Sequence, residues 1–113
     1  MVRKSFDQPD ERKSPAPRTT FEVVDLGGLP FTKMTMAPGW RWSQDVKPVA
    51  KTASCQARHV LSFLSGRLRV RMDDGKEMEF GPGDIAIIPA GHDAWVVGDE
   101  PHVALEMSAA VKP

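Results

Sequence analysis

The sequence has little that would tie it to a disulfide, a membrane or a nucleic acid. Its single cysteine, Cys55, excludes an internal disulfide and is typical of a reducing compartment. No apolar run is long enough to span a bilayer, and the N-terminal stretch MVRKSFDQPDERKSPAPR has no apolar core of the kind that signal peptides carry. Basic and acidic residues balance at 15 each, so no net charge attracts nucleic acid or an anionic membrane. We therefore expect a cytoplasmic protein that binds neither nucleic acid nor a membrane.

The length and composition are those of one soluble globular domain, because 113 residues are too few for two. Residues 1–18 are polar, charged and interrupted by prolines, so they have little apolar surface to offset the entropy of ordering. We predict an extended or partly disordered arm over residues 1–18. It is either a loose tail or an arm that pairs with a neighbouring subunit. The domain itself then covers residues 19–113.

From residue 19 onward, short strands alternate with Gly and Pro turns. Strands are predicted for TTFEVVDL (19–26), PFTKMTM (30–36), HVLSFLSG (59–66), IAIIP (85–89), AWVV (94–97) and HVALEM (102–107). We expect the strand IAIIP to be buried. The segment WRWSQDVKPVAKTAS (40–54) has no clean period and contains Pro48, so we expect a long loop with at most one short strand. AGHD (90–93) is predicted to be a turn. No segment has a sustained helical period, which favours an all-β sandwich or barrel.

The clearest local pattern is the hairpin RLRVRMDDGKEMEF over residues 67–80. Apolar residues alternate with arginines before the Asp74-Gly75 turn and with glutamates after it. The glutamates should lie opposite the arginines on the solvent side of the sheet. This striping indicates a solvated face rather than a nucleic-acid patch. The residues expected to face the core are Leu68, Val70, Met72, Met78 and Phe80.

The stretches VLSFLSGRLRV and GPGDIAIIPAGHDAW resemble the two conserved motifs of the cupin superfamily of small β-barrels. Gly66, Gly83, Pro89 and Gly91 stand at the structural positions of those motifs. The resemblance covers residues 38–107. It implies an all-β, cupin-type jelly-roll barrel that forms a single domain and associates as a homodimer.

This chain departs from the family pattern at the positions of the usual metal ligands. The usual glutamate position of the first motif holds His59, and the two histidine positions before it hold Ala53 and Cys55. In the second motif, the usual histidine position holds Ala94, while His92 stands nearer the turn. Cys55, His59 and His92 remain as candidate ligands for one divalent transition metal, such as zinc, iron or nickel.

The path of the chain decides whether Cys55 and His59 can share an ion. Residues four apart on a straight strand are separated by roughly 13 Å, too far for a common metal. A reversal within the intervening QAR would turn both side chains into the barrel. Alternatively, Cys55 is a small buried residue, His59 a hydrogen-bonded core histidine and His92 an exposed turn residue. A further alternative is a thiolate nucleophile at Cys55 with His59 as its base, for which the sequence shows no orienting third group.

Three residues near the motifs are candidates for contact with a small-molecule ligand. Trp42 precedes the first motif and Trp95 follows the second-motif turn, so both either approach the mouth of the barrel or fill the core. Arg41 is a candidate for contact with an anionic ligand. Arg58 is the poorer candidate, because on a regular strand it would face away from the pocket that His59 faces.

Two further polar residues have open roles. Asp93 stands beside His92 and either orients its ring or caps a turn. His102 opens the last predicted strand, and we expect it at the surface.

Three functional hypotheses remain, because a barrel of this type hosts many chemistries. The first is a small-molecule-binding domain without robust catalysis, favoured by the altered ligand set and the small size. The second is a metal-dependent enzyme, such as a dioxygenase or isomerase, that acts on a small polar metabolite. The third is an interaction module that works through exposed edge strands and the arm of residues 1–18.

Overall fold

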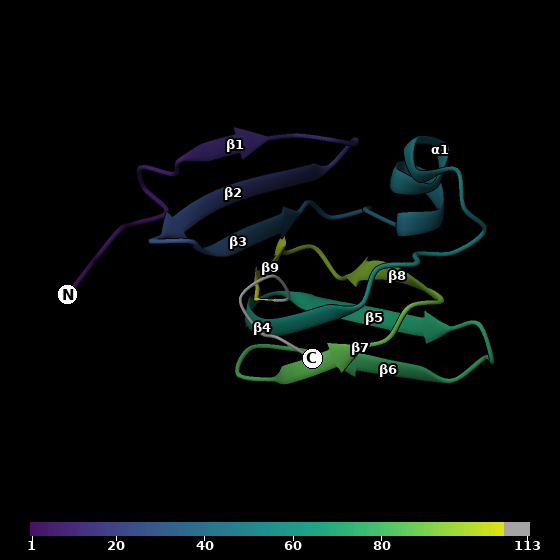
Figure 1. The fold of residues 1–113 in the computed structure, drawn as a ribbon. Coiled ribbons are helices and arrows are strands. Elements are labelled where there is room, and N and C mark those ends of the chain that lie inside the picture. Colours follow the sequence, from purple (N-terminus) through teal and green to yellow (C-terminus); the bar gives the residue numbers. More distant parts are fainter. Residues whose placement is uncertain (108–113) are drawn as a thin grey trace.

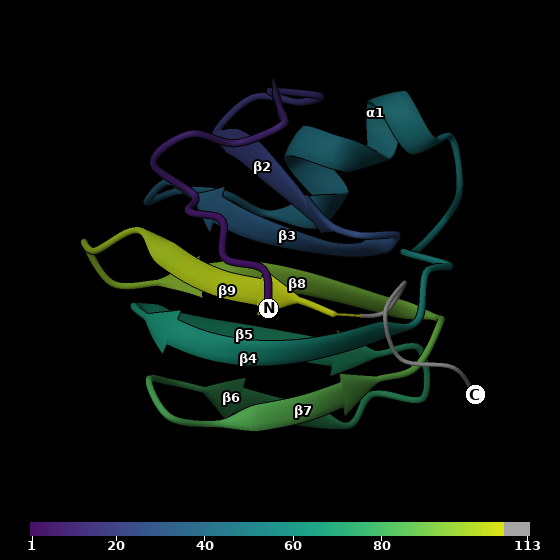
Figure 2. The same ribbon diagram turned by 60° about the vertical axis from the view of Figure 1, so that its left-hand side comes forward.

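The computed structural model describes residues 1–107, in which nine strands form two antiparallel sheets (Figure 1). One sheet has the strand order β1-β2-β3-β9-β4-β7 and the other the order β6-β5-β8. Figure 2 shows β9, β4 and β7 in a layer in front of β8, β5 and β6. The predicted all-β jelly-roll sandwich is therefore confirmed. The strands are β1 (Glu11–Lys13), β2 (Thr19–Leu26), β3 (Leu29–Met36), β4 (His59–Ser65), β5 (Arg67–Met72), β6 (Glu77–Phe80), β7 (Ile85–Ile88), β8 (His92–Val97) and β9 (His102–Glu106).

The β5–β6 hairpin forms with the predicted register and charge pairing. Arg69 lies opposite Glu79, and Arg69 Nε donates a 2.6 Å hydrogen bond to Glu77. The predicted core face is correct for Leu68, Val70 and Phe80, which are buried. It is wrong for Met78, which is 62% exposed. Since β6 is an edge strand of the smaller sheet, its residues have a neighbouring strand on one side only.

The strand IAIIP of the second motif, predicted to be buried, is buried on one face only. Strand β7 lies at the edge of the larger sheet and is buried on one face only, so Ile85 and Ile87 are exposed while Ala86 and Ile88 are buried. The turn predicted over residues 90–93 ends earlier than expected. Strand β8 already begins at His92.

The segment expected to be a long loop is helical. A π-helical turn over Trp42–Val46 leads into the short helix α1, Lys47–Ala50. Buried Asp45 holds the start of this segment, because its carboxylate accepts bonds from the Arg41 backbone N–H and from Arg18 Nη1. Pro48 lies in the first turn of α1, where its missing N–H costs nothing. No helix within residues 1–107 is both long enough and apolar enough to cross a membrane.

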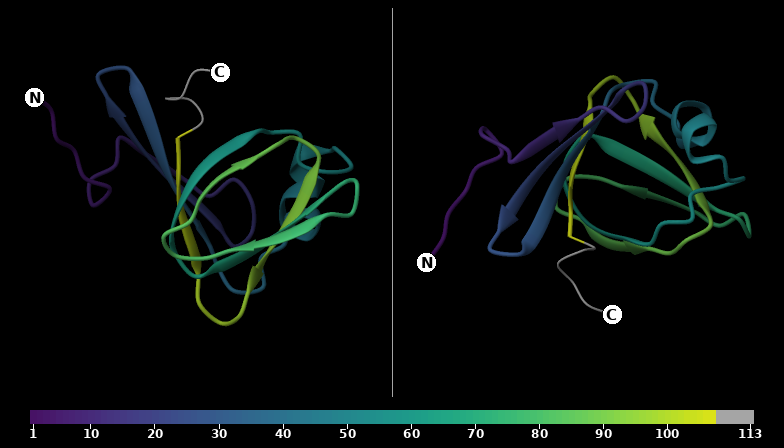
Figure 3. Two further views of the ribbon diagram at one scale, coloured as in Figure 1. Left: turned by 90° about the horizontal axis from the view of Figure 1, so that it is seen from below. Right: turned by 45° about the horizontal axis from the view of Figure 1, so that its top comes forward.

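The predicted arm of residues 1–18 contains a strand of its own. Strand β1 pairs antiparallel with β2 of the same chain, with Lys13 opposite Phe21. Lys4 and Asp10 form an exposed ion pair just before it. The β2–β3 hairpin that carries this strand extends away from the barrel, as both views of Figure 3 show.

The core between the sheets contains one histidine that the sequence did not place there. His102, expected at the surface, is 1% exposed. Its strand β9 lies between β3 and β4 in the middle of the larger sheet, and His102 pairs with buried Met36. The chain enters this strand past Gly66, where any Cβ would collide with the Pro101 carbonyl oxygen.

Candidate metal centre

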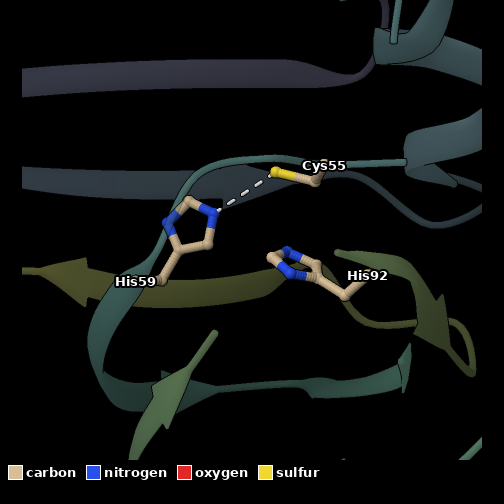
Figure 4. A group of neighbouring side chains, drawn as sticks. All are labelled: Cys55, His59 and His92. Atoms are coloured by element: carbon tan, nitrogen blue, oxygen red, sulfur yellow. Dashed lines mark hydrogen bonds between the residues drawn. The ribbon is translucent and has the colours of Figure 1, made fainter. Parts of the chain in front are cut away.

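Cys55, His59 and His92 come together where β4 and β8 begin, and their side chains point toward one another (Figure 4). One potential ligand atom from each lies within 4.8 Å of the others, so the group could hold a metal ion. Cys55 Sγ is 3.7 Å from His59 Nε2. Cys55 and His92 are buried, and His59 is half-buried. The structure thus brings together all three predicted ligands.

The chain reversal needed for this convergence occurs between Cys55 and β4. Cys55 pairs with His92 in an isolated bridge, in which its N–H donates to the His92 carbonyl oxygen at 2.7 Å. Residues 56–58 have no regular structure, and β4 begins immediately after them at His59. On the other side, Gly91 N–H donates to the Cys55 carbonyl oxygen at 2.7 Å. Gly91 has φ +90°, and a Cβ there would lie 2.8 Å from Asp73 Oδ2, so the position favours glycine.

Glu106 fixes the orientation of His59. Its Oε2 lies 2.6 Å from His59 Nδ1, and because a carboxylate only accepts, Nδ1 carries the proton of this bond. The opposite ring nitrogen, Nε2, then faces Cys55. The sequence analysis missed Glu106, although it stands at the end of the predicted last strand. Only the pairing of β9 with β4 brings it beside His59.

A backbone carbonyl orients the second histidine in the same way. His92 Nδ1 donates a 2.7 Å bond to the Pro89 carbonyl oxygen, so the lone pair of the neutral ring lies on Nε2. The alternative of an exposed turn residue is wrong, since His92 is 3% exposed and belongs to β8. Asp93 does not orient this ring. Its Oδ1 accepts bonds from the backbone N–H groups of Ser43 and Ala94.

The contacts within the group favour a thiolate and an imidazolium. Burial raises the pKa of Cys55, but its interactions with His59 and His92 outweigh burial and lower the pKa to about 6. Burial lowers the pKa of His59, but its hydrogen bonds to Cys55 and Glu106 outweigh it and raise the pKa to about 9. The thiolate is the form of cysteine that ligates metals, whereas His59 would lose its Nε2 proton when an ion binds.

These features fit a transition-metal site. A tetrahedral zinc ion, about 2.3 Å from sulfur and about 2.0–2.1 Å from nitrogen, separates the two ligand atoms by about 3.6 Å. The Cys55–His59 separation of 3.7 Å is close to this value. Each histidine donates its Nδ1 proton to an oxygen, as metal-ligating histidines do. Three protein ligands leave one position open on a four-coordinate ion.

The predicted ligand-contact residues lie elsewhere around this centre. Trp42 is buried in the core. Trp95 alternates with His92 along β8 and therefore lies on the opposite face of the strand. The Arg41 guanidinium stacks 4.4 Å from the centre of the Trp95 ring and is paired with Asp93. A role for Trp42, Trp95 and Arg41 in ligand contact stays a prediction.

Glu106 also changes the assessment of Cys55 as a nucleophile. The sequence showed no third group beside the Cys55–His59 pair, whereas the structure supplies one in Glu106. The order thiolate, imidazole, carboxylate is that of a nucleophile with an oriented base. Cys55 is nevertheless buried, and the ring of His92 also lies beside its sulfur. The surroundings of the sulfur therefore resemble a ligand site more than an exposed nucleophile.

Solved structures share this fold over most of the chain. A protein of unknown function from Rhizobium leguminosarum bv. viciae is 23% identical, with a TM-score of 0.65 over 94% of this chain and 93% of that one. The polyketide cyclase RemF from Streptomyces resistomycificus is 21% identical, with a TM-score of 0.62 over 94% and 77%. VPA0057 from Vibrio parahaemolyticus, of unknown function, is 13% identical, with a TM-score of 0.60 over 86% and 96%. At these identities the likeness concerns the fold alone.

The family comparison is more specific. The comparison with curated proteins found no match. The sequence profile of the EutQ-like cupin domain matches residues 35–112, which is more than half of the chain. That stretch contains Cys55, His59 and His92 as well as both stretches that resemble the cupin motifs. The chain therefore belongs to the cupin superfamily, in the family of EutQ-like cupin domains.

Proposed function

We propose that this cupin domain binds one divalent transition metal ion through Cys55, His59 and His92 and uses the site to bind a small molecule. Zinc, iron and nickel suit a set of one thiolate and two imidazoles. The observation that carries the proposal is the convergence of three ligand atoms within 4.8 Å, with both histidines already oriented through Nδ1. A bound ion of this kind would act as a Lewis acid toward a ligand oxygen at the open position.

The residues around the ligands supply the remaining functions of such a site. Glu106 holds the ring of His59 and balances positive charge, while the Pro89 carbonyl holds the ring of His92. Cys55 and His92 are buried, which limits the access of bulk water to them. Binding without turnover is the simplest role for this arrangement, since the carboxylate of Glu106 is already bonded to His59.

A metal-dependent enzyme, such as a dioxygenase or isomerase, is the second candidate. One observation favours it: the three-residue ligand set leaves the open position that catalytic metal sites keep, whereas structural zinc sites have four protein ligands. An experiment can distinguish the two candidate functions, because an enzyme loses turnover when the metal is removed. A binding domain has no turnover to lose.

The test of the metal site is elemental analysis after loading. Tag-free protein is loaded separately with Zn²⁺, Fe²⁺ and Ni²⁺ under reducing conditions, dialysed and analysed beside Cys55→Ala, His59→Ala and His92→Ala. His102→Gln is the matched control, because His102 is a buried histidine outside the centre. We expect near-stoichiometric metal in the parent and control and loss in the three variants. A parent without metal, or variants that retain it equally, would refute the proposal.

We also propose that the chain forms a homodimer. Exposed Ile85 and Ile87 support this, because they alternate along β7 with buried Ala86 and Ile88 and so lie together on the outer face of the larger sheet. Light scattering of the parent beside Ile87→Glu tests it. We expect a dimer that the variant converts to a monomer, and a monomeric parent would refute it.

A further inference from the structure

A hollow of about 330 Å³ lies beside the centre, between the β2–β3 hairpin and residues 57–59. The hairpin extends beyond the barrel (Figure 3). His59 and Glu106 of the centre line one side of it. Strands β1, β2 and β3 line the other side. The hollow therefore opens onto the imidazole and carboxylate that orient the candidate metal site, and it is of the size that small-molecule pockets have.

The floor of the hollow is apolar and built by strand pairing. Phe21 of β2 pairs directly with Met34 of β3, so the two side chains lie on the same face. Both are partly buried and pack against the core. Val23 continues this surface two residues along β2. Because the strands hold these side chains in place, an apolar ligand body meets a preformed surface.

The rim of the hollow carries two exposed cations. Lys13 of β1 lies opposite Phe21, so it stands on the inner face as well. Its ion pair with Glu11 is 3.8 Å long and exposed, which leaves the ammonium available. Arg58 precedes His59 and lines the hollow from the other side. Within residues 1–107, Arg58 makes no ion pair.

We propose that this hollow binds a small organic carboxylate with an apolar body, held between Lys13 and Arg58 with its body on Phe21 and Met34. The proposal deepens the small-molecule role proposed above by naming the class of ligand and the cations that select it. It also gives the N-terminal strand β1 a function, since β1 supplies Lys13. Arg58, rather than Arg41, then becomes the arginine that meets an anion.

Charge decides against the other ligand classes. Glu106, an acidic residue that lines the hollow, is paired with His59 at 2.6 Å, which offsets its negative charge. A cationic ligand would place a third positive charge at this rim, which costs affinity. A neutral amide would fill the apolar floor but leave both cations without a partner.

Three isosteric probes test the proposal: phenylacetate, its neutral amide and the cation phenylacetamidine. Each is titrated into metal-free and zinc-loaded protein while backbone amide shifts are followed by NMR. The variants are Arg58→Gln and Lys13→Gln, and the control is Arg71→Gln, an exposed arginine on the smaller sheet. We expect phenylacetate to bind at least about fivefold more tightly than either isostere. Each hollow variant should weaken phenylacetate several-fold, and the control should not.

The metal-free samples keep this result separate from the metal proposal. Carboxylate selectivity that depends on Arg58 in metal-free protein supports the hollow even if no metal binds at the centre. Equal binding of the three probes, or binding that Arg58→Gln and Lys13→Gln leave unchanged, refutes the hollow while stoichiometric metal still supports the centre. Phenylacetate that binds only zinc-loaded protein, without dependence on Arg58, also refutes it, because the carboxylate then binds the ion directly.

Discussion

Two histidines, half-buried His59 and buried His102, lie at the two ends of strand β9 in opposite states. At its end, Glu106 bonds His59 Nδ1 at 2.6 Å, and the pKa of His59 is raised to about 9. At its start, the buried Nδ1 of His102 has no partner among residues 1–107, and burial lowers its pKa to about 4. Burial alone thus makes a neutral core histidine. A candidate ligand arises where the chain also orients the ring and places a thiolate opposite it.

The neighbours of the two histidines differ in the same way. The ring of His102 is tilted against Phe63 at 5.4 Å, and Phe63 stacks on Phe80 at 4.9 Å. His59 instead meets a thiol, a carboxylate and a second imidazole. We therefore expect the His102 end to determine stability and the His59 end to determine binding.

Truncation of the aromatic end should have the largest effect. Phe63→Ala removes a ring that is 1% exposed and should lower the free energy of unfolding by about 3–5 kcal/mol. Urea denaturation of metal-free protein measures this, with Cys55→Ala as the comparison at the other end. Phe63→Leu is the milder variant if Phe63→Ala does not fold. Equal losses for Phe63→Leu and Cys55→Ala would remove the distinction between the two ends.

Loss of the orienting carboxylate should weaken metal binding without unfolding the chain. Glu106→Gln keeps the shape of the side chain but replaces the charged acceptor with a neutral one, so we expect about 10–100-fold lower metal affinity. Competition against a chelating dye measures the affinity. The control is Glu79→Gln, which removes an exposed partner of Arg67 on the other sheet. Unchanged affinity in Glu106→Gln would mean that Glu106 only fills space beside His59.

His102 should make the fold sensitive to acid. Its pKa in the folded state lies below the ordinary value of 6.5, so at intermediate pH the unfolded chain binds a proton that the folded chain does not. This contribution destabilises the fold as pH falls, by about 2 kcal/mol between pH 7 and pH 5. Urea denaturation at both pH values, in the parent and in His102→Gln, isolates it. The same pH dependence in both proteins would show that other groups cause the loss.

The sequence was sufficient for the parts of the fold and site that depend on local pattern. The alternation around Asp74-Gly75 predicted the β5–β6 hairpin and its charge pairs, and the motif spacing led to Cys55, His59 and His92. The sequence did not predict the exposure of side chains that depends on the position of a strand in its sheet. Met78 is exposed because β6 lies at the edge of the smaller sheet, and Ile87 is exposed because it lies on the outer face of β7.

The missed site residue has the same cause. Glu106 meets His59 only because β9 pairs with β4 across a long sequence separation, and no local pattern carries that information. His102 is buried because β9 lies in the middle of the larger sheet. The helical turn over Trp42–Val46 was not predicted for another reason. Asp45 stabilises it through Arg18, a residue of the arm predicted to be extended or partly disordered.

The smallest effect is expected at Arg41, on the outer side of the centre. Arg41 stacks on Trp95 and pairs with Asp93, on the face of β8 that points away from His92. Arg41→Gln should therefore cost about 0.5–1 kcal/mol of stability, the size of an exposed cation–π contact. Metal affinity and phenylacetate binding should stay unchanged, as chelator competition and NMR titration would show. A several-fold loss of phenylacetate binding in Arg41→Gln, with Arg58→Gln silent, would restore the sequence-based assignment of Arg41 and move the anion site to this face.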